Sequence, residues 1–353
     1  MDVPALLHNA TVLLSQASTR HTHPGLYAGV DLSQLSVLEQ LWVDWYQWWG
    51  NPILATGVMS FVLHELLYFG RALPFILLDS MPYFRKYKIQ PGKAPTKEQQ
   101  WKCTKSVLLQ HFSVELPQRE HWLTNKRWTQ IYLFYPMAAS VGMQTYHVPF
   151  PDLKTIAWQV GLNVSAPAAL ASITLFFFVE DTWHYFAHRL FHTKYLYKHI
   201  HKVHHTYSAP FGLAAEYAHP LETLILGAGT VLAPLGFCYL SAGKMHILTM
   251  VRRTAFARCL AVPRLNPFYI WIALRLFQAI DSHSGYDFPV SLRHFLPIWA
   301  GAEHHDYHHS QFVDCYASSF RHWDWLLGSD RRYHAYHKRQ DEEKKRARLA
   351  KAE

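Results

Sequence analysis

Residues 180–210 read EDTWHYFAHRLFHTKYLYKHIHKVHHTYSAP and follow a continuous apolar segment. Three histidines of this stretch, His184, His188 and His192, are spaced by four residues, so a helix presents them on one face. Residues 156–179, directly before them, are long and apolar enough to form a membrane-spanning helix. The stretch therefore predicts a helical protein in which imidazoles gather where an apolar helix ends.

Two five-residue motifs extend this pattern, HKVHH at 201–205 and HDYHH at 305–309. Offsets of three and four residues again place imidazoles on one side of a predicted helix. A lone helical histidine is more often an ordinary surface or core residue, but protonated imidazoles packed this closely would repel one another. A bound metal removes the repulsion because it holds the rings neutral and coordinated through nitrogen. The motifs therefore predict metal binding. Two clusters suggest two ions, and imidazole suits zinc, iron and copper alike.

The composition favours a membrane protein with a large aqueous part. Half of the 353 residues are apolar and 17% are charged, against roughly 25% in an average soluble domain. We interpret residues 72–83, which Pro74 and Asp79 interrupt, as the return arm of a helical hairpin, and the polar residues 84–127 as an aqueous loop. Four stretches approach the ~20 residues that cross a bilayer, namely 52–70, 131–150, 156–179 and 221–240.

Charge and cysteine content narrow the functional classes. The net charge of +9, with histidine neutral, favours an anionic membrane surface or an acidic partner. Nucleic acid is disfavoured because the lysines and arginines lie between apolar stretches and form no single stripe. The four scattered cysteines form no CxxC pair, which argues against a disulfide framework or a zinc ribbon. The alternative to membrane spans, core helices of a soluble α-helical protein, remains open.

The histidine motifs also carry a family resemblance. HRLFH (188–192), HKVHH and HDYHH resemble the three histidine boxes of the fatty acid hydroxylase and sterol desaturase superfamily. Longer segments, YKHIHKVHHTYSAPFGLAAEYAHPLETLILG, LRLFQAIDSHSGYDFP and GAEHHDYHH, resemble its sterol C4-methyl oxidase branch. The resemblance runs from roughly residue 40 to residue 335.

This resemblance implies an enzyme: a multi-pass monooxygenase of the endoplasmic reticulum membrane with a non-haem di-iron centre. It would use O2 to oxidise the methyl groups at sterol C4 stepwise to carboxylate, in sterol biosynthesis. Electrons would come from NAD(P)H through cytochrome b5 or a similar donor, and other sterol C4-demethylation enzymes would be partners. Zinc is expected to replace iron in some structures. No nucleic acid is expected to bind.

The resemblance also implies the metal ligands. The three boxes and two further superfamily positions supply His188, His192, His201, His204, His205, His219, His283, His305, His308 and His309. His184 and His304 are expected either to bind the metal themselves or to contact the metal ligands from the side away from the metal. Asp181 and Glu216 are expected to orient imidazole N–H groups from behind the ligands.

The expected architecture is therefore an all-α integral membrane helical bundle with a cytosolic histidine-rich di-metal cap. Residues 1–50 form an N-terminal segment, 51–337 the membrane catalytic domain, and 338–353 a charged cytosolic tail. One segment departs from the family pattern, residues 251–268, VRRTAFARCLAVPRLNPF. It interrupts an apolar helix that leads into His283, and we interpret it as a gene-model artefact or a tolerated aqueous loop.

Two alternative functions remain open on the sequence alone. The first is another superfamily hydroxylase or desaturase, acting on a fatty acyl chain or on a different sterol carbon. The second is a non-catalytic membrane metal-binding or transport protein. A transporter would place its ligands inside the apolar spans, whereas these motifs lie in polar sequence just outside them.

Overall fold

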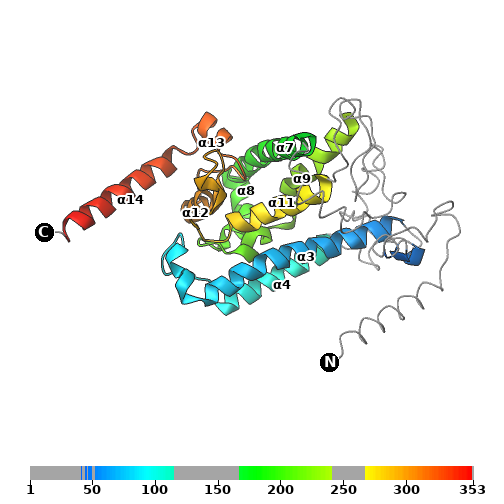
Figure 1. Cartoon of the computed structure of the whole chain (residues 1–353), viewed down its shortest axis with the longest axis horizontal. Helices are drawn as coiled ribbons and strands as arrows, with labels where there is room; N and C mark the ends of the chain where they lie inside the picture. The colour runs from blue at the N-terminus through cyan, green and yellow to red at the C-terminus, as the bar shows by residue number, and fades with distance from the viewer. Residues whose placement is uncertain are drawn as a thin grey trace. The chain divides into compact units, whose positions relative to one another are not determined.

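The computed structural model describes residues 52–114, 167–240 and 267–351 and a few positions between 41 and 49 (Figure 1). Two compact units divide the chain, and the second unit (His64–Phe112, Thr174–Ala233 and Ile272–Glu353) contains every side chain discussed below. The described residues form no β-strand, only two isolated bridges, so the all-α prediction is confirmed for them. The elements used below are α3 (Pro52–Ser80), α4 (Lys97–Val114), α7 (Pro167–Phe191), η3 (His201–Thr206), η4 (Gly212–Glu216), α9 (Pro220–Leu240), α11 (Pro267–Ser282), α12 (Gly301–Gln311) and α14 (Arg331–Leu349).

Helix α3 runs without a break across the predicted hairpin, so that prediction is wrong. Pro74 lies inside the helix and removes one backbone hydrogen bond, to the carbonyl of Gly70. The buried side chains of Tyr68 and Phe75, on either side of this position, pack in a hydrophobic cluster. Burial of these aromatic rings offsets the loss of one hydrogen bond, so the helix continues to Ser80.

Helix α4 runs antiparallel to α3 and takes the place of the predicted return arm. Near one end Gln100 Nε2 lies 3.4 Å from Asp79 Oδ2, and near the other His111 Nδ1 lies 2.7 Å from Glu65 Oε1. The aqueous loop predicted over 84–127 is therefore helical at Lys97–Val114. Its exposed charged residues concealed this in the sequence, because only a narrow side of α4 is buried.

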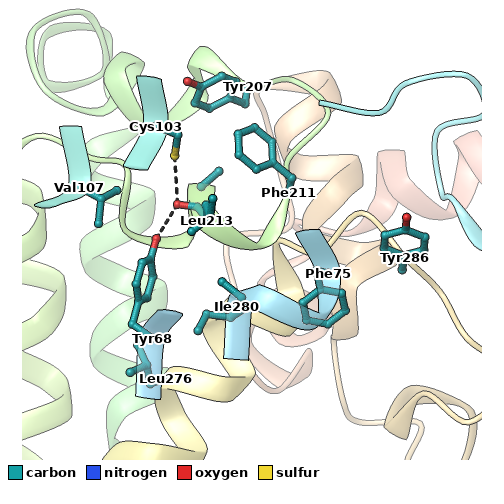
Figure 2. Packing of buried hydrophobic residues seen from close by; sticks show 12 residues of the cluster. Tyr68, Phe75, Cys103, Val107, Tyr207, Phe211, Leu213, Leu276, Ile280 and Tyr286 are labelled. Atoms are coloured by element: carbon teal, nitrogen blue, oxygen red, sulfur yellow. Dashed lines mark hydrogen bonds between the residues drawn. The ribbon is translucent and has the colours of Figure 1, made fainter. Parts of the chain in front are cut away.

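A hydrophobic cluster joins α3, α4, η4 and α11 (Figure 2). Tyr68 Oη and Cys103 Sγ both donate hydrogen bonds to the carbonyl oxygen of Leu213, which brings α3 and α4 to the same point of η4. Ile280 of α11 and Leu213 are buried in the same cluster. The cluster thereby fixes the short segment between η3 and α9 and the end of α11.

The turn after α11 requires glycine. Gly285 has a φ of +70°, a conformation that L side chains rarely adopt. A Cβ atom at this position would lie 2.8 Å from the carbonyl oxygen of Pro210. The turn follows His283 directly, so close approach of two backbone segments fixes the chain where a predicted ligand leaves its helix.

One helix among the described residues is long and apolar enough to cross a membrane, Phe61–Ser80. A shorter apolar helix covers Pro220–Pro234. The predicted span at 131–150 and residues 251–266 of the atypical segment lie outside the described residues. Helix α14 continues unbroken across residue 338, where we placed the start of the tail.

Replacing Gly285 with alanine should destabilise the protein more than the same change at Gly92. Both glycines have positive φ, and nothing lies within 4 Å of a Cβ at Gly92. Alanine costs about 1–2 kcal/mol for the left-handed conformation at either site, and the clash with Pro210 adds about 1–3 kcal/mol at Gly285 alone. The thermal unfolding midpoints of Gly285→Ala and Gly92→Ala, measured side by side, test this. Equal midpoints would contradict the close backbone contact.

Candidate metal centre

Nine of the ten histidines expected as ligands converge into two groups. Within each group, one ring nitrogen from every residue lies within 4.8 Å of the others. The first group contains His188, His192, His201, His205 and His308, and the second contains His204, His283, His305 and His309. His219 belongs to neither group.

Each HxxHH motif contributes to both groups, which corrects the expectation that a motif presents its imidazoles to one side. In the motif at 201–205, His204 joins the second group, while His201 and His205 join the first. This segment is a 3-10 helix, η3, in which residues three apart lie almost one above the other. The rings of His201 and His204 accordingly stack, with 5.5 Å between their centroids, although the two residues belong to different groups. In α12, His308 and His309 belong to different groups, because neighbouring residues of an α-helix point about 100° apart.

The outer ring nitrogens are anchored to the surrounding backbone. A carbonyl oxygen can only accept a hydrogen bond, so each Nδ1 that contacts one must carry the proton, and Nε2 is then left as a bare lone pair. Five rings donate from Nδ1 to carbonyls at 2.6–3.3 Å: His188 to Tyr316, His308 to Asp314, His283 to Ala279, His309 to Tyr207 and His204 to Tyr217.

A sixth ring is anchored by a carboxylate. His201 Nδ1 lies 2.8 Å from Glu222 Oε1, near the start of α9, and both groups are buried. A carboxylate behind a ligating histidine fixes the ring and raises its basicity. Sequence reasoning did not select Glu222. Its signal was an isolated acid in the otherwise apolar stretch at 221–240.

Two pairs of rings with anchored outer nitrogens bring their inner nitrogens face to face. His188 Nε2 lies 3.1 Å from His201 Nε2, and His204 Nε2 lies 3.2 Å from His283 Nε2. In the second pair both rings carry the proton on Nδ1, so two lone pairs are in close contact and cannot form a hydrogen bond. The first pair is in the same state when Glu222 is ionised and accepts the proton of His201 Nδ1. A cation between them resolves the repulsion. Adjacent ligands with bonds of about 2.1 Å lie about 3 Å apart at right angles, which matches the observed spacing.

Burial keeps these rings neutral. Burial, reinforced by the neighbouring histidines, lowers the pKa of His188 and His308 well below the ordinary value. Burial also lowers the pKa of His192 and His204 to about 4. At neutral pH every one of these imidazoles therefore offers a lone pair, which metal coordination requires.

Three other histidines that were predicted at the site, His184, His219 and His304, belong to neither group. His219 Nδ1 accepts a hydrogen bond from the backbone N–H of Leu221 at the start of α9. The ring of His184 is 5.3 Å from that of His188, centroid to centroid. The buried His304 packs edge-on against Tyr333.

The two predicted carboxylates hold other parts of the structure. Asp181 Oδ1 accepts hydrogen bonds from the backbone N–H groups of residues 318–320, at 2.6–3.2 Å. Glu216 contacts His64 and His111, which belong to neither histidine group. Neither carboxylate makes the expected contact with a ring of the two groups, and Glu222 makes one instead.

Comparison with known proteins agrees with this site. The fatty acid hydroxylase family model matches residues 173–329, which include both histidine groups. A C-4 methylsterol oxidase of Schizosaccharomyces pombe is 54% identical over 86% of this chain and 86% of its own length. A methylsterol monooxygenase of Aspergillus fumigatus is 50% identical over 88% and 91% of the two chains. Methylsterol monooxygenase 1 of Rattus norvegicus is 38% identical over 78% of each.

No solved structure matches the chain. The matched relatives nevertheless span most of its length and are 38–54% identical to it. The resemblance expected from the histidine boxes is thereby confirmed, and the chain belongs to the methylsterol monooxygenase family, among the proteins of the fatty acid hydroxylase type.

Proposed function

We propose that this protein is a C4-methylsterol monooxygenase, which uses O2 to oxidise the methyl groups at sterol C4 stepwise to carboxylate. The observation that carries the proposal is the pair of buried histidine groups whose unprotonated Nε2 atoms converge, in a chain 54% identical to a C-4 methylsterol oxidase. Oxidation of an unactivated methyl group exceeds what amino-acid side chains can do alone.

Two iron ions, one in each histidine group, would supply the activation of O2 needed for this oxidation. The proposed ligands are the nine converging histidines, and zinc would suit the same nitrogen atoms. The protein would hold six of these nine imidazoles in one tautomer through the Nδ1 hydrogen bonds described above. Burial of the rings would exclude water around the reacting oxygen.

The exposed surface supports a membrane location. A hollow of about 460 Å³ between α7 and α9 is lined by apolar side chains, among them Trp183, Phe186 and Leu232. On α7, Trp183 and Phe186 lie on the side of the helix opposite His188, so this hollow does not lead to the histidine groups. Trp183 and Phe186 are 41% and 47% exposed, as expected for side chains that face lipid.

We further propose a multi-pass protein of the endoplasmic reticulum with the metal centre on the cytosolic side. Its catalytic domain would cover residues 51–337, between an N-terminal segment and a charged tail. Electrons would come from NAD(P)H through cytochrome b5 or a similar acidic donor. Four exposed cations near the histidine motifs, Arg189, Lys194, Lys198 and Lys202, could attract that donor by charge.

Removing one ligand from each group should abolish the reaction. We expect the double variant His204→Ala, His308→Ala to lower turnover of a 4,4-dimethylsterol by about a hundred-fold or more, because O2 activation supplies several kcal/mol of the catalysis. Product analysis by mass spectrometry measures this, with the exposed His199→Ala as the matched control. A wild-type protein that consumes O2 but leaves the C4 methyls intact would favour a different superfamily substrate. Metal binding without O2 consumption would favour a non-catalytic protein.

Replacing the carboxyl group of Glu222 should weaken metal binding without removing a ligand. Glu222→Gln keeps the size of the side chain and puts an amide in place of the carboxyl group that faces Nδ1 of His201. We expect metal affinity to fall by about 10- to 100-fold, the usual cost of losing such a partner. Competition with a chelator measures the affinity, and the exposed Glu98→Gln serves as the control. Equal affinities would rule out this role of Glu222.

The metal-free protein should lose stability as the pH falls from about 6.5 to about 4. The pKa of His192 and His204 is lowered to about 4 by burial, against about 6.5 in an unfolded chain. In this window the unfolded state binds more protons than the folded state, so acidification favours unfolding. Thermal unfolding of the chelator-treated protein at a series of pH values tests this. A midpoint that stays constant would contradict neutral, buried rings.

A further inference from the structure

A third group of histidine and carboxylate side chains lies apart from the two histidine groups. His64 and Glu65 of α3 and His111 of α4 each place one ligand atom within 4.8 Å of the others. The side chain of His111 is 2% exposed, and those of His64 and Glu65 are less than one-fifth exposed. His64 and Glu65 also lie within the apolar segment Phe61–Ser80, where ionisable residues usually mark a functional site.

The two rings are oriented in the same way. Glu65 Oε1 lies 2.7 Å from His111 Nδ1 and 3.9 Å from His64 Nδ1. On the far side of the rings, Glu216 Oε1 lies 3.2 Å from His64 Nε2, and its Oε2 lies 2.8 Å from His111 Nε2. Each imidazole therefore faces Glu65 with Nδ1 and Glu216 with Nε2. Histidines that bind a metal through one nitrogen usually donate the other N–H to a carboxylate in this manner.

We propose that His64, Glu65 and His111 bind a third metal ion, a divalent zinc-like cation, through both Nδ1 atoms and the Glu65 carboxylate. Two histidines and one glutamate form a zinc set that leaves a fourth position for water. Glu216 is a positioning residue that orients both rings from behind.

Hydrogen bonds alone explain the surroundings of the Glu65 carboxylate less well than a bound cation does. Both Nδ1 atoms lie nearest to one oxygen, Oε1, while Oε2 is buried and accepts no hydrogen bond from the described part of the chain. A buried carboxylate oxygen without a partner is costly, whereas a cation can contact both oxygens.

The third ion would also brace the main centre. It would join α3 and α4, and through Glu216 it would hold the end of η4. The next residue, Tyr217, offers its carbonyl to Nδ1 of His204 at 3.3 Å. We therefore expect the ion to stabilise the structure and not to take part in the reaction. Its presence does not depend on which sterol the enzyme oxidises.

Counting metal ions tests the proposal directly. The full-length protein and the variants His111→Gln and Glu65→Gln are purified, saturated with zinc, dialysed and measured by inductively coupled plasma mass spectrometry. We expect each variant to hold one ion per chain fewer than the wild type, whatever the number bound by the two histidine groups. The exposed His199→Gln should keep the wild-type count. Equal counts in all four proteins would overturn the proposal.

A variant that unfolds would lose metal for a different reason, so a milder change decides that case. Glu216→Gln keeps all three ligands and alters only the group behind them. We expect it to retain the wild-type ion count at saturation and to weaken zinc binding at one site by about 10- to 100-fold in chelator competition. Unchanged affinity at every site would overturn the proposal even if His111→Gln failed to fold.

Discussion

The structure depends on close contact between unprotonated imidazole nitrogens in a buried environment. His188 and His201 in one group, and His204 and His283 in the other, bring Nε2 atoms to 3.1–3.2 Å with no proton between them. Such contacts are repulsive in a protein without metal and favourable around a cation. The arrangement is held because backbone carbonyls and Glu222 fix the outer nitrogen of these rings.

The loop that supplies the carbonyl of Tyr316 is held in turn by two buried carboxylates. Asp324 accepts hydrogen bonds from the backbone N–H groups of Tyr316 and Ala317, and the carbonyl of Tyr316 faces His188. Asp181 accepts hydrogen bonds from the backbone N–H groups of residues 318–320. Hydrogen bonds from backbone N–H groups offset the cost of burying a carboxylate. The position of His188 thus depends on acids that do not touch its ring.

Histidine spacing and the family resemblance together predicted that these histidines converge, but not how they divide between two groups. In the 3-10 helix at His201–Thr206 the rings of His201 and His204 stack on each other, yet they belong to different groups, which the offsets in HKVHH do not reveal. Glu222 escaped prediction because its partner His201 lies 21 residues away, across η4. Helix α4 was not predicted because its buried side is narrow. The prediction divided α3 at Pro74, but the helix is continuous because tertiary burial outweighs the loss of one hydrogen bond.

The division of each motif between the groups has a consequence for how the apoprotein matures. If both groups bind metal as proposed, an ion in either group would take ligands from both η3 and α12. By holding these two elements together it would also fix the positions of the histidines of the other group. Uptake should therefore be cooperative, and half-loaded chains should be scarce at any metal concentration. Loss of the box at 201–205 or at 305–309 would remove ligands from both groups, whereas loss of HRLFH would remove ligands from the first group alone.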